Sequence, residues 1–263
     1  MASVTSSQLA ATGSKASTLG GIAAALLAGP ALGAQPLETE TARLPGKGHG
    51  SVELGLEHIR SKDERGLVAP ALLRYGVTDR LQLTVEPVAY QTINPKVGRT
   101  YRGIGDTELI LTYLVADETA LRPALALAGE VKLPTAKSPR LGSGKTDVRV
   151  FGIASKRVGR FDLHANFGYT LVGDPAGANF ANLVDYAVAA EYAYSPAVVL
   201  MAEVFGETPV GRSTTGGPEA ASTVVTGMAG ARYKAADRVK LWFAVTYDTE
   251  GEAVFKPGIA FTF

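Results

Sequence analysis

The feature of this sequence that most constrains its fold is a two-residue alternation of side-chain types, which recurs from residue 51 to the carboxyl terminus. It is clearest in residues 161–171, where apolar side chains hold every odd position from Phe161 to Leu171 and the even positions carry Asp, His, Asn, Gly and Thr. A β-strand puts successive side chains on opposite faces, and no helix would sort these residues so well. The alternation therefore predicts an all-β protein.

Twelve strands of this kind are predicted, and their connections differ in length. Those after the second, fourth, sixth, eighth and tenth strands are short, and those after the third, fifth, seventh and ninth are longer. This is typical of a single antiparallel up-and-down transmembrane β-barrel with about 12 strands. The sixth predicted strand has the least regular alternation. The predicted strands are residues 51–60, 67–77, 81–90, 105–115, 123–133, 147–155, 161–171, 184–194, 198–206, 223–233, 239–247 and 254–263.

A soluble β-sandwich or lipocalin-like barrel would show the same alternation, with the apolar face inside. Three features favour the membrane: the even strand number, the asymmetry of the connections and the aromatic end of the chain. The last strand carries aromatic or aliphatic residues at alternate positions and stops at Phe263. A terminal strand of this type resembles the assembly signal of bacterial outer-membrane barrels, which implies the barrel assembly machinery and outer-membrane lipid as partners.

The amino-terminal residues predict the compartment. After a Ser/Thr-rich start, residues 20–28 are apolar, and small residues follow at the positions that a signal peptidase reads, near Gly33 and Ala34. The expected organisation is a signal peptide in residues 1–34, a periplasmic lead-in in residues 35–50 and a transmembrane barrel in residues 51–263. The expected location is the outer membrane of a Gram-negative bacterium, with short turns and both ends of the barrel in the periplasm.

Composition excludes several other classes of protein. The formal net charge is only +1, so no basic excess exists to neutralise nucleic-acid phosphates. The chain has no cysteine, hence no disulfide and no thiolate metal site. Its mean hydropathy of +0.10 is too low for a helical membrane bundle, whereas a barrel with one polar face averages to such a value.

Three short segments carry a resemblance to a known family. They are Gly103–Glu108, Val131–Thr135 with Leu141–Gly144, Thr146 and Asp147, and His164–Tyr169. Together they make the chain, from the second predicted strand to its end, similar to the outer-membrane proteins associated with the meta-pathway of phenol degradation. The resemblance implies the barrel fold and an outer-membrane location. It also implies uptake of small molecules, among them aromatic or hydrophobic compounds.

Apparent enzyme motifs fail on their spacing, and no catalytic, cofactor-binding or metal-binding residue is predicted. Gly144-Lys145-Thr146 lacks the earlier glycine of a phosphate-binding loop, since Pro139 stands there. Glu108 replaces the third glycine of a dinucleotide fingerprint that Gly103 would begin. A histidine between carboxyl and amide side chains, at position 164, could act as a base, but the sequence assigns no nucleophile to it.

Function is therefore expected on the polar faces of the strands, which would line a narrow, charged lumen. The first hypothesis is a channel or transporter for small molecules, and the alternatives are a plugged structural barrel and a membrane-embedded hydrolase. Basic residues of the longer loops are expected to contact lipopolysaccharide phosphates. The residues predicted to line the lumen are Glu53, Glu57, Arg74, Glu86, Asp106, Glu108, Glu130, Lys132, Asp147, Arg149, Asp162, His164, Asp185, Glu191, Glu203, Arg232, Lys240 and Lys256.

Overall fold

The computed structural model describes residues 37–138, 140–173, 181–210 and 223–263. No helix in these residues is long and apolar enough to cross a membrane. Every helix or strand element that they form is a strand: β1 (Gly50–Gly55), β2 (Glu57–Arg60), β3 (Glu64–Thr78), β4 (Leu81–Pro95), β5 (Tyr101–Gly103), β6 (Thr107–Ala116), β7 (Ala124–Leu133), β8 (Asp147–Val158), β9 (Phe161–Leu171), β10 (Asn182–Ala193), β11 (Val198–Val210), β12 (Val224–Ala236), β13 (Val239–Asp248) and β14 (Ala253–Thr262).

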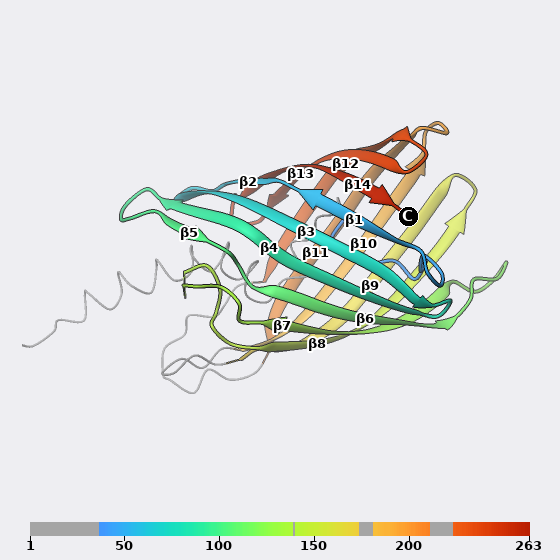
Figure 1. The fold of residues 1–263 in the computed structure, drawn as a ribbon, viewed down its shortest axis with the longest axis horizontal. Helices are drawn as coiled ribbons and strands as arrows, with labels where there is room; N and C mark the ends of the chain where they lie inside the picture. The colour runs from blue at the N-terminus through green and yellow to red at the C-terminus, as the bar shows by residue number, and fades with distance from the viewer. Residues whose placement is uncertain (1–36, 139, 174–180, 211–222) are drawn as a thin grey trace, which may run out of the picture.

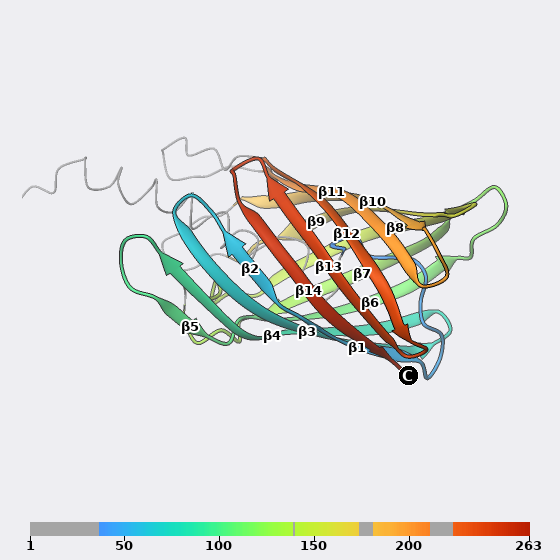
Figure 2. The same cartoon turned by 90° about the horizontal axis from the view of Figure 1, so that it is seen from above.

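The strands form one closed antiparallel barrel (Figures 1 and 2). From β6 to β14 each strand pairs with the next along the chain, β4 pairs with β3 and β6, and β14 closes the ring by pairing with both β1 and β2. These two short strands share one position in the wall, since both also pair with β3, while β5 pairs with β4 alone. The ring therefore has twelve strand positions, as predicted, with β2 and β5 as additional segments.

A proline marks the point where β1 gives way to β2. Pro257 lies inside β14, where it has no N–H for the ladder. The partner strand is interrupted at the same level, because β1 pairs up to Gly258 and β2 resumes at Phe255. A single bond from the N–H of Leu56 to the carbonyl of Pro257 spans the gap. The single strand predicted over residues 51–60 is thus two strands.

Other differences from the prediction concern regularity and boundaries. Residues 147–155 were expected to be the least regular strand, but β8 extends to Val158 and alternates between buried and exposed side chains along most of its length. The predicted turn over residues 61–66 is shorter, since β3 begins at Glu64. The predicted loop over residues 91–102 contains the end of β4 and part of β5.

The apolar face of the wall points outward. Large aliphatic and aromatic side chains remain exposed along most strands, for example Leu127, Phe167 and Val188 at 53%, 66% and 61%. Monomeric soluble proteins rarely expose so large a continuous apolar surface, whereas a lipid-facing barrel requires it. Charged and hydroxyl side chains are buried on the opposite face of the same strands.

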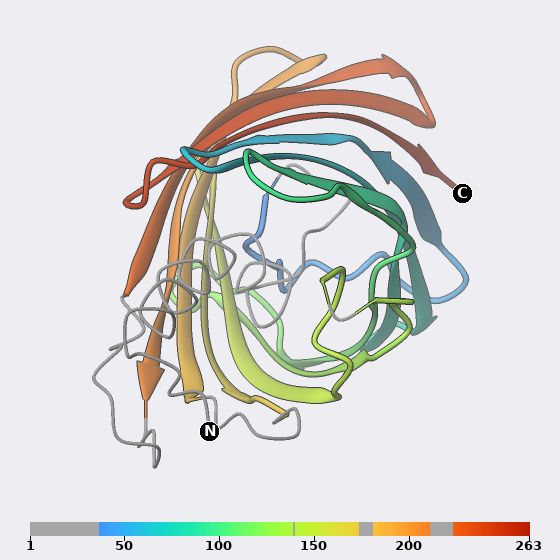
Figure 3. The same cartoon turned by 90° about the vertical axis from the view of Figure 1, so that its left-hand side faces the viewer.

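The barrel encloses an inner segment that we call the strap, residues 37–49. Seen along the barrel in Figure 3, the strap runs inside the ring before it turns into β1. Residues 35–50 were expected to be a periplasmic lead-in, and for residues 37–43 this is wrong, because they bind side chains of the inner wall. The predicted signal peptide, residues 1–34, lies outside the described residues.

Candidate functional site: the barrel lumen

The start of the strap is held by one carboxylate of β11 and one ammonium of β14. Glu203 accepts hydrogen bonds from the backbone N–H groups of Glu38 at 3.0 Å and Thr39 at 2.5 Å, and from the Thr39 hydroxyl. Lys256 pairs with the Glu38 carboxylate and, at 3.1 Å, with Glu57 of β2. These bonds satisfy polar groups that would otherwise be buried without partners.

The middle of the strap is held by amide and hydroxyl side chains of β8 and β9. Asn166 accepts a bond from the backbone N–H of Glu40 at 2.6 Å and donates one to its carbonyl at 2.9 Å. The backbone N–H of Ala42 donates to the Ser155 hydroxyl at 2.9 Å. Neighbouring apolar contacts support this position, since Leu37 packs with Met201 and Met228 in one buried cluster and Ala42 joins Ile110 and Phe151 in another.

A charged anchor follows toward the turn end of the barrel. Arg43 donates two bonds to Asp162, from Nε at 2.8 Å and from Nη2 at 2.7 Å, and reaches Glu118 in the β6–β7 turn at 2.7 Å. A backbone bond from Arg157, together with Arg43, lowers the pKa of Glu118 to about 2. The carboxylate that receives the strap outside the membrane-spanning strands therefore stays ionised at neutral pH.

At the opposite end, the β7–β8 loop folds into the mouth of the barrel. Leu141 is 1% exposed and packs against Ile59, Val68, Ile93 and Val254, all of which point inward. Its carbonyl accepts a bond from the amide of Gln91 at 2.5 Å. The inner wall is therefore less uniformly polar than expected, because the strap and this loop each cover apolar residues of the wall.

Ion pairs dominate the half of the lumen on the loop side of the strap. Arg149 pairs with Glu130 at 3.1 Å and with Asp185, and Lys132 pairs with Asp147. Two further carboxyl groups lie next to each other, because Glu86 is the register partner of Glu108 in the β4–β6 pairing. In the described part of the chain, both Glu86 oxygens and one Glu108 oxygen are buried without a hydrogen-bond partner. This half of the lumen is thus rich in acidic side chains.

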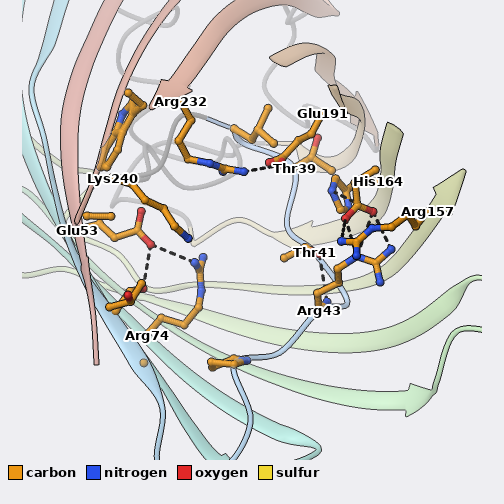
Figure 4. A pocket seen from close by; sticks show the side chains of 18 residues that line it. Thr39, Thr41, Arg43, Glu53, Arg74, Arg157, His164, Glu191, Arg232 and Lys240 are labelled. Carbon is orange, nitrogen blue, oxygen red and sulfur yellow. Dashed lines mark hydrogen bonds and ion pairs between the residues drawn. The ribbon is translucent and has the colours of Figure 1, made fainter. Parts of the chain in front are cut away.

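The turn-end half of the lumen, by contrast, contains a cavity of about 390 Å³ on the other side of the strap (Figure 4). Strap residues from Leu37 to Pro45 form one side of it, and β1, β3, β8, β9, β10, β12, β13 and β14 form the rest. Its border includes Gly50 and Thr262, next to the end of the barrel where the chain terminates. A cavity therefore remains between the strap and the short-turn end.

The side chains predicted to line the lumen all lie on the inner face of the wall, but the structure divides them into two groups. Those on the cavity are Glu53, Arg74, Asp162, His164, Glu191, Arg232 and Lys240. The others, further from the turn end, are Glu57, Glu86, Asp106, Glu108, Glu130, Lys132, Asp147, Arg149, Asp185, Glu203 and Lys256.

The structure supplies a hydroxyl partner for His164 that the sequence did not reveal. Ser155 lies across the β8–β9 ladder, with its Oγ 2.8 Å from Nδ1 of the ring. The other ring nitrogen is 3.9 Å from Asp162, too far for a hydrogen bond, and that carboxylate is already bound by Arg43 and Arg157. Ser155 is also 1% exposed beneath the strap. This geometry suits an anchor for the strap better than a nucleophile and its base.

The wall of the barrel is closed, its apolar face points outward and its interior is charged. These three features define an outer-membrane β-barrel. The chain belongs to the family described as "Putative MetA-pathway of phenol degradation", whose model matches residues 33–257. This confirms the resemblance seen in the sequence. No curated protein matches the chain.

Solved structures share the fold at low sequence identity. The COG4313 outer membrane channel from Pseudomonas putida F1 is 14% identical, with a TM-score of 0.66 over 82% of this chain and 96% of that one. The KdgM porin is 8% identical, with a TM-score of 0.54 over 80% and 99%. The translocator domain of autotransporter NalP from Neisseria meningitidis is 12% identical, with a TM-score of 0.52 over 96% and 98%.

Proposed function

We propose that this barrel is a narrow outer-membrane channel for small molecules, including aromatic compounds such as phenol. The observation that carries the proposal is the cavity of about 390 Å³ inside a charged lumen, because a purely structural barrel of this size could be filled by side chains. The family description, with its link to phenol degradation, supports the aromatic class of solute.

The strap sets the width of this channel. It crosses the lumen between the cavity and the acidic half, and polar bonds rather than a large apolar core hold most of its length. Glu203 alone accepts three of those bonds. Loss of this acceptor leaves buried donors unpaired, and the strap is expected to leave the wall.

Proteoliposomes test both statements. Vesicles that contain the wild-type protein should release entrapped phenol faster than protein-free vesicles, whose release measures passive leakage. Vesicles that contain Glu203→Ala should release it faster still. Glu250→Ala, at an exposed turn carboxylate, is the control and should match the wild type. Phenol release equal to that of protein-free vesicles, for both the wild type and Glu203→Ala, would rule out the channel.

The hydrogen bond between Ser155 and His164 favours one alternative, a hydrolase. A Ser155→Ala variant separates the two functions. As an anchor, Ser155 contributes only to holding the strap, so the variant should raise phenol release and leave hydrolysis of p-nitrophenyl butyrate at the rate without protein. If the wild type hydrolyses this ester and Ser155→Ala does not, the hydrolase would be favoured over the channel.

Lipopolysaccharide is a proposed partner at the loop end. Arg99 and Arg140 lie against the ring of Tyr101, at 5.1 and 5.7 Å from its centre, so two guanidinium groups stand together on the outer mouth. Such a pair suits a phosphate. Replacing both arginines with alanine should weaken binding of purified lipopolysaccharide, and unchanged binding would exclude this contact.

A further inference from the structure

The cavity below the strap is bordered by more cationic side chains than carboxylates. Five cationic side chains border it, against three carboxylates, and Figure 4 labels all of them except Asp162. The cations are Arg43, Arg74, Arg157, Arg232 and Lys240, and the carboxylates are Glu53, Asp162 and Glu191.

Each of the three carboxylates is already neutralised by an arginine. Glu191 pairs with Arg232 at 2.5 Å, and Glu53 pairs with Arg74 at 3.3 Å. Asp162 is shared by Arg43 and Arg157, as described above. Arg43 also pairs with Glu118 at 2.7 Å and Arg74 with Glu40 at 3.5 Å, so all four arginines have carboxylate partners.

Lys240 is the cation of this set that differs from the four arginines. It is half-buried on β13, and no hydrogen bond or ion pair to its Nζ exists in the described part of the chain. In Figure 4 its ammonium group points into the cavity. Its neighbour in the register on β14 is Ala260, whose small side chain leaves space in front of the ammonium group. A partly desolvated ammonium without a partner favours an anion in that space.

Apolar surface stands next to the free ammonium group. Trp242 follows two residues later on the same face of β13, and its indole lies so close over Gly258 that a methyl group there would meet ring atoms at 2.0 and 2.3 Å. Leu37 of the strap borders the same cavity. An anion with a carbon skeleton fits this combination better than a small inorganic ion.

We propose that the cavity is a binding site for a small organic monocarboxylate, which Lys240 holds by its charged end and Trp242 and Leu37 contact along its apolar body. The ligand enters from the periplasmic end, because the strap and the unpaired carboxylates of Glu86 and Glu108 stand on the other side. The inference rests on the proposed channel only in placing this site on the solute pathway.

Trp242 is the only tryptophan of the chain, so its fluorescence reports on the cavity directly. Detergent-solubilised full-length protein is titrated with benzoate, with its neutral analogue benzamide and with sulfate. Benzoate should change the emission in a saturable manner, with weaker effects from the other two. Lys240→Met keeps the length of the side chain and should weaken benzoate binding about tenfold, the loss expected for one charged hydrogen bond.

Lys234→Met is the matched control, because Lys234 is the register partner of Lys240 on β12 but pairs with Asp237 at 2.8 Å in the turn. It should bind benzoate like the wild type. Equal binding of benzamide or sulfate, or full binding by Lys240→Met, would overturn the site. Phenol release without benzoate binding would refute the site and leave the channel standing. Benzoate binding without phenol release would support the site and refute the channel.

Discussion

Two phenylalanines on β9 show how the position of a residue in the membrane determines its contribution. Phe161 and Phe167 both face outward, at 47% and 66% exposure, but the first lies at the turn end of the strand and the second near its middle. An arginine costs about 2 to 4 kcal/mol at the bilayer midplane and about 0 to 1 near its surface. Phe167→Arg should therefore lower the free energy of unfolding by more than Phe161→Arg, as measured by urea titration in lipid vesicles. Equal losses would contradict the lipid-facing assignment of this face.

Gly258 is fixed by its neighbour rather than by backbone conformation. A methyl group at this position would collide with the Trp242 ring and lie 2.8 Å from the carbonyl of Leu54. Gly258→Ala should therefore destabilise the barrel by about 1 to 3 kcal/mol and shift the tryptophan emission. Gly129→Ala, at a strand glycine with open space around it, is the control. Wild-type emission from Gly258→Ala would show that the indole lies elsewhere.

At the scale of single elements, prediction succeeded where one face of a strand is uniformly polar. In β9 it is, and the bounds 161–171 are confirmed. In β8 the inner face carries Arg149 but also Phe151 and Ile153, which pack against Ala42 of the strap. These apolar inner residues weaken the alternation of side-chain types in residues 147–155, which is why that strand was predicted to be the least regular, although its buried and exposed positions alternate.

The strap itself could not be predicted, because most partners of residues 37–43 lie more than a hundred residues away in the sequence. The bonds to Asn166 and Glu203, for example, span 126 and 165 residues. One local sign was available, the alternation of Leu37, Thr39 and Thr41 with Glu38 and Glu40 in a segment that was predicted to be a lead-in. The polarity of the lumen was predictable, whereas the division of its charges into two halves depends on the strap.

Leu141 supplies a buried apolar contact that holds the β7–β8 loop in the barrel mouth. Truncating a buried leucine to alanine costs about 2 to 5 kcal/mol, and here the cost falls on the docking of the loop. Leu141→Ala should accelerate trypsin cleavage after Arg140 and Lys145 in the folded barrel. Val97→Ala, at a residue that is 78% exposed, should not. Unchanged cleavage in Leu141→Ala would mean that other contacts dock the loop.

The molecule as a whole depends on the closure of its ring at the carboxyl terminus. Phe263 and Gly50 exchange two backbone hydrogen bonds of 3.0 Å, which fasten the end of β14 to the start of β1. Deletion of Phe263 should reduce the amount of folded barrel in the outer membrane, detected as the band that migrates differently before and after boiling. Recovery of the full-length wild type as a soluble periplasmic protein would contradict the membrane assignment.

We propose that the strap constricts a conducting lumen, and a reversible lock on the strap can decide this. The hydroxyl oxygens of Thr41 and Ser155 are 3.3 Å apart, and the chain has no cysteine, so Thr41→Cys with Ser155→Cys can form one defined disulfide. In planar bilayers the oxidised protein should conduct less than the wild type, and reduction with dithiothreitol should raise its conductance, while the Thr41→Cys single variant should not respond. Identical conductance before and after reduction, with the disulfide verified by mass, would contradict the account.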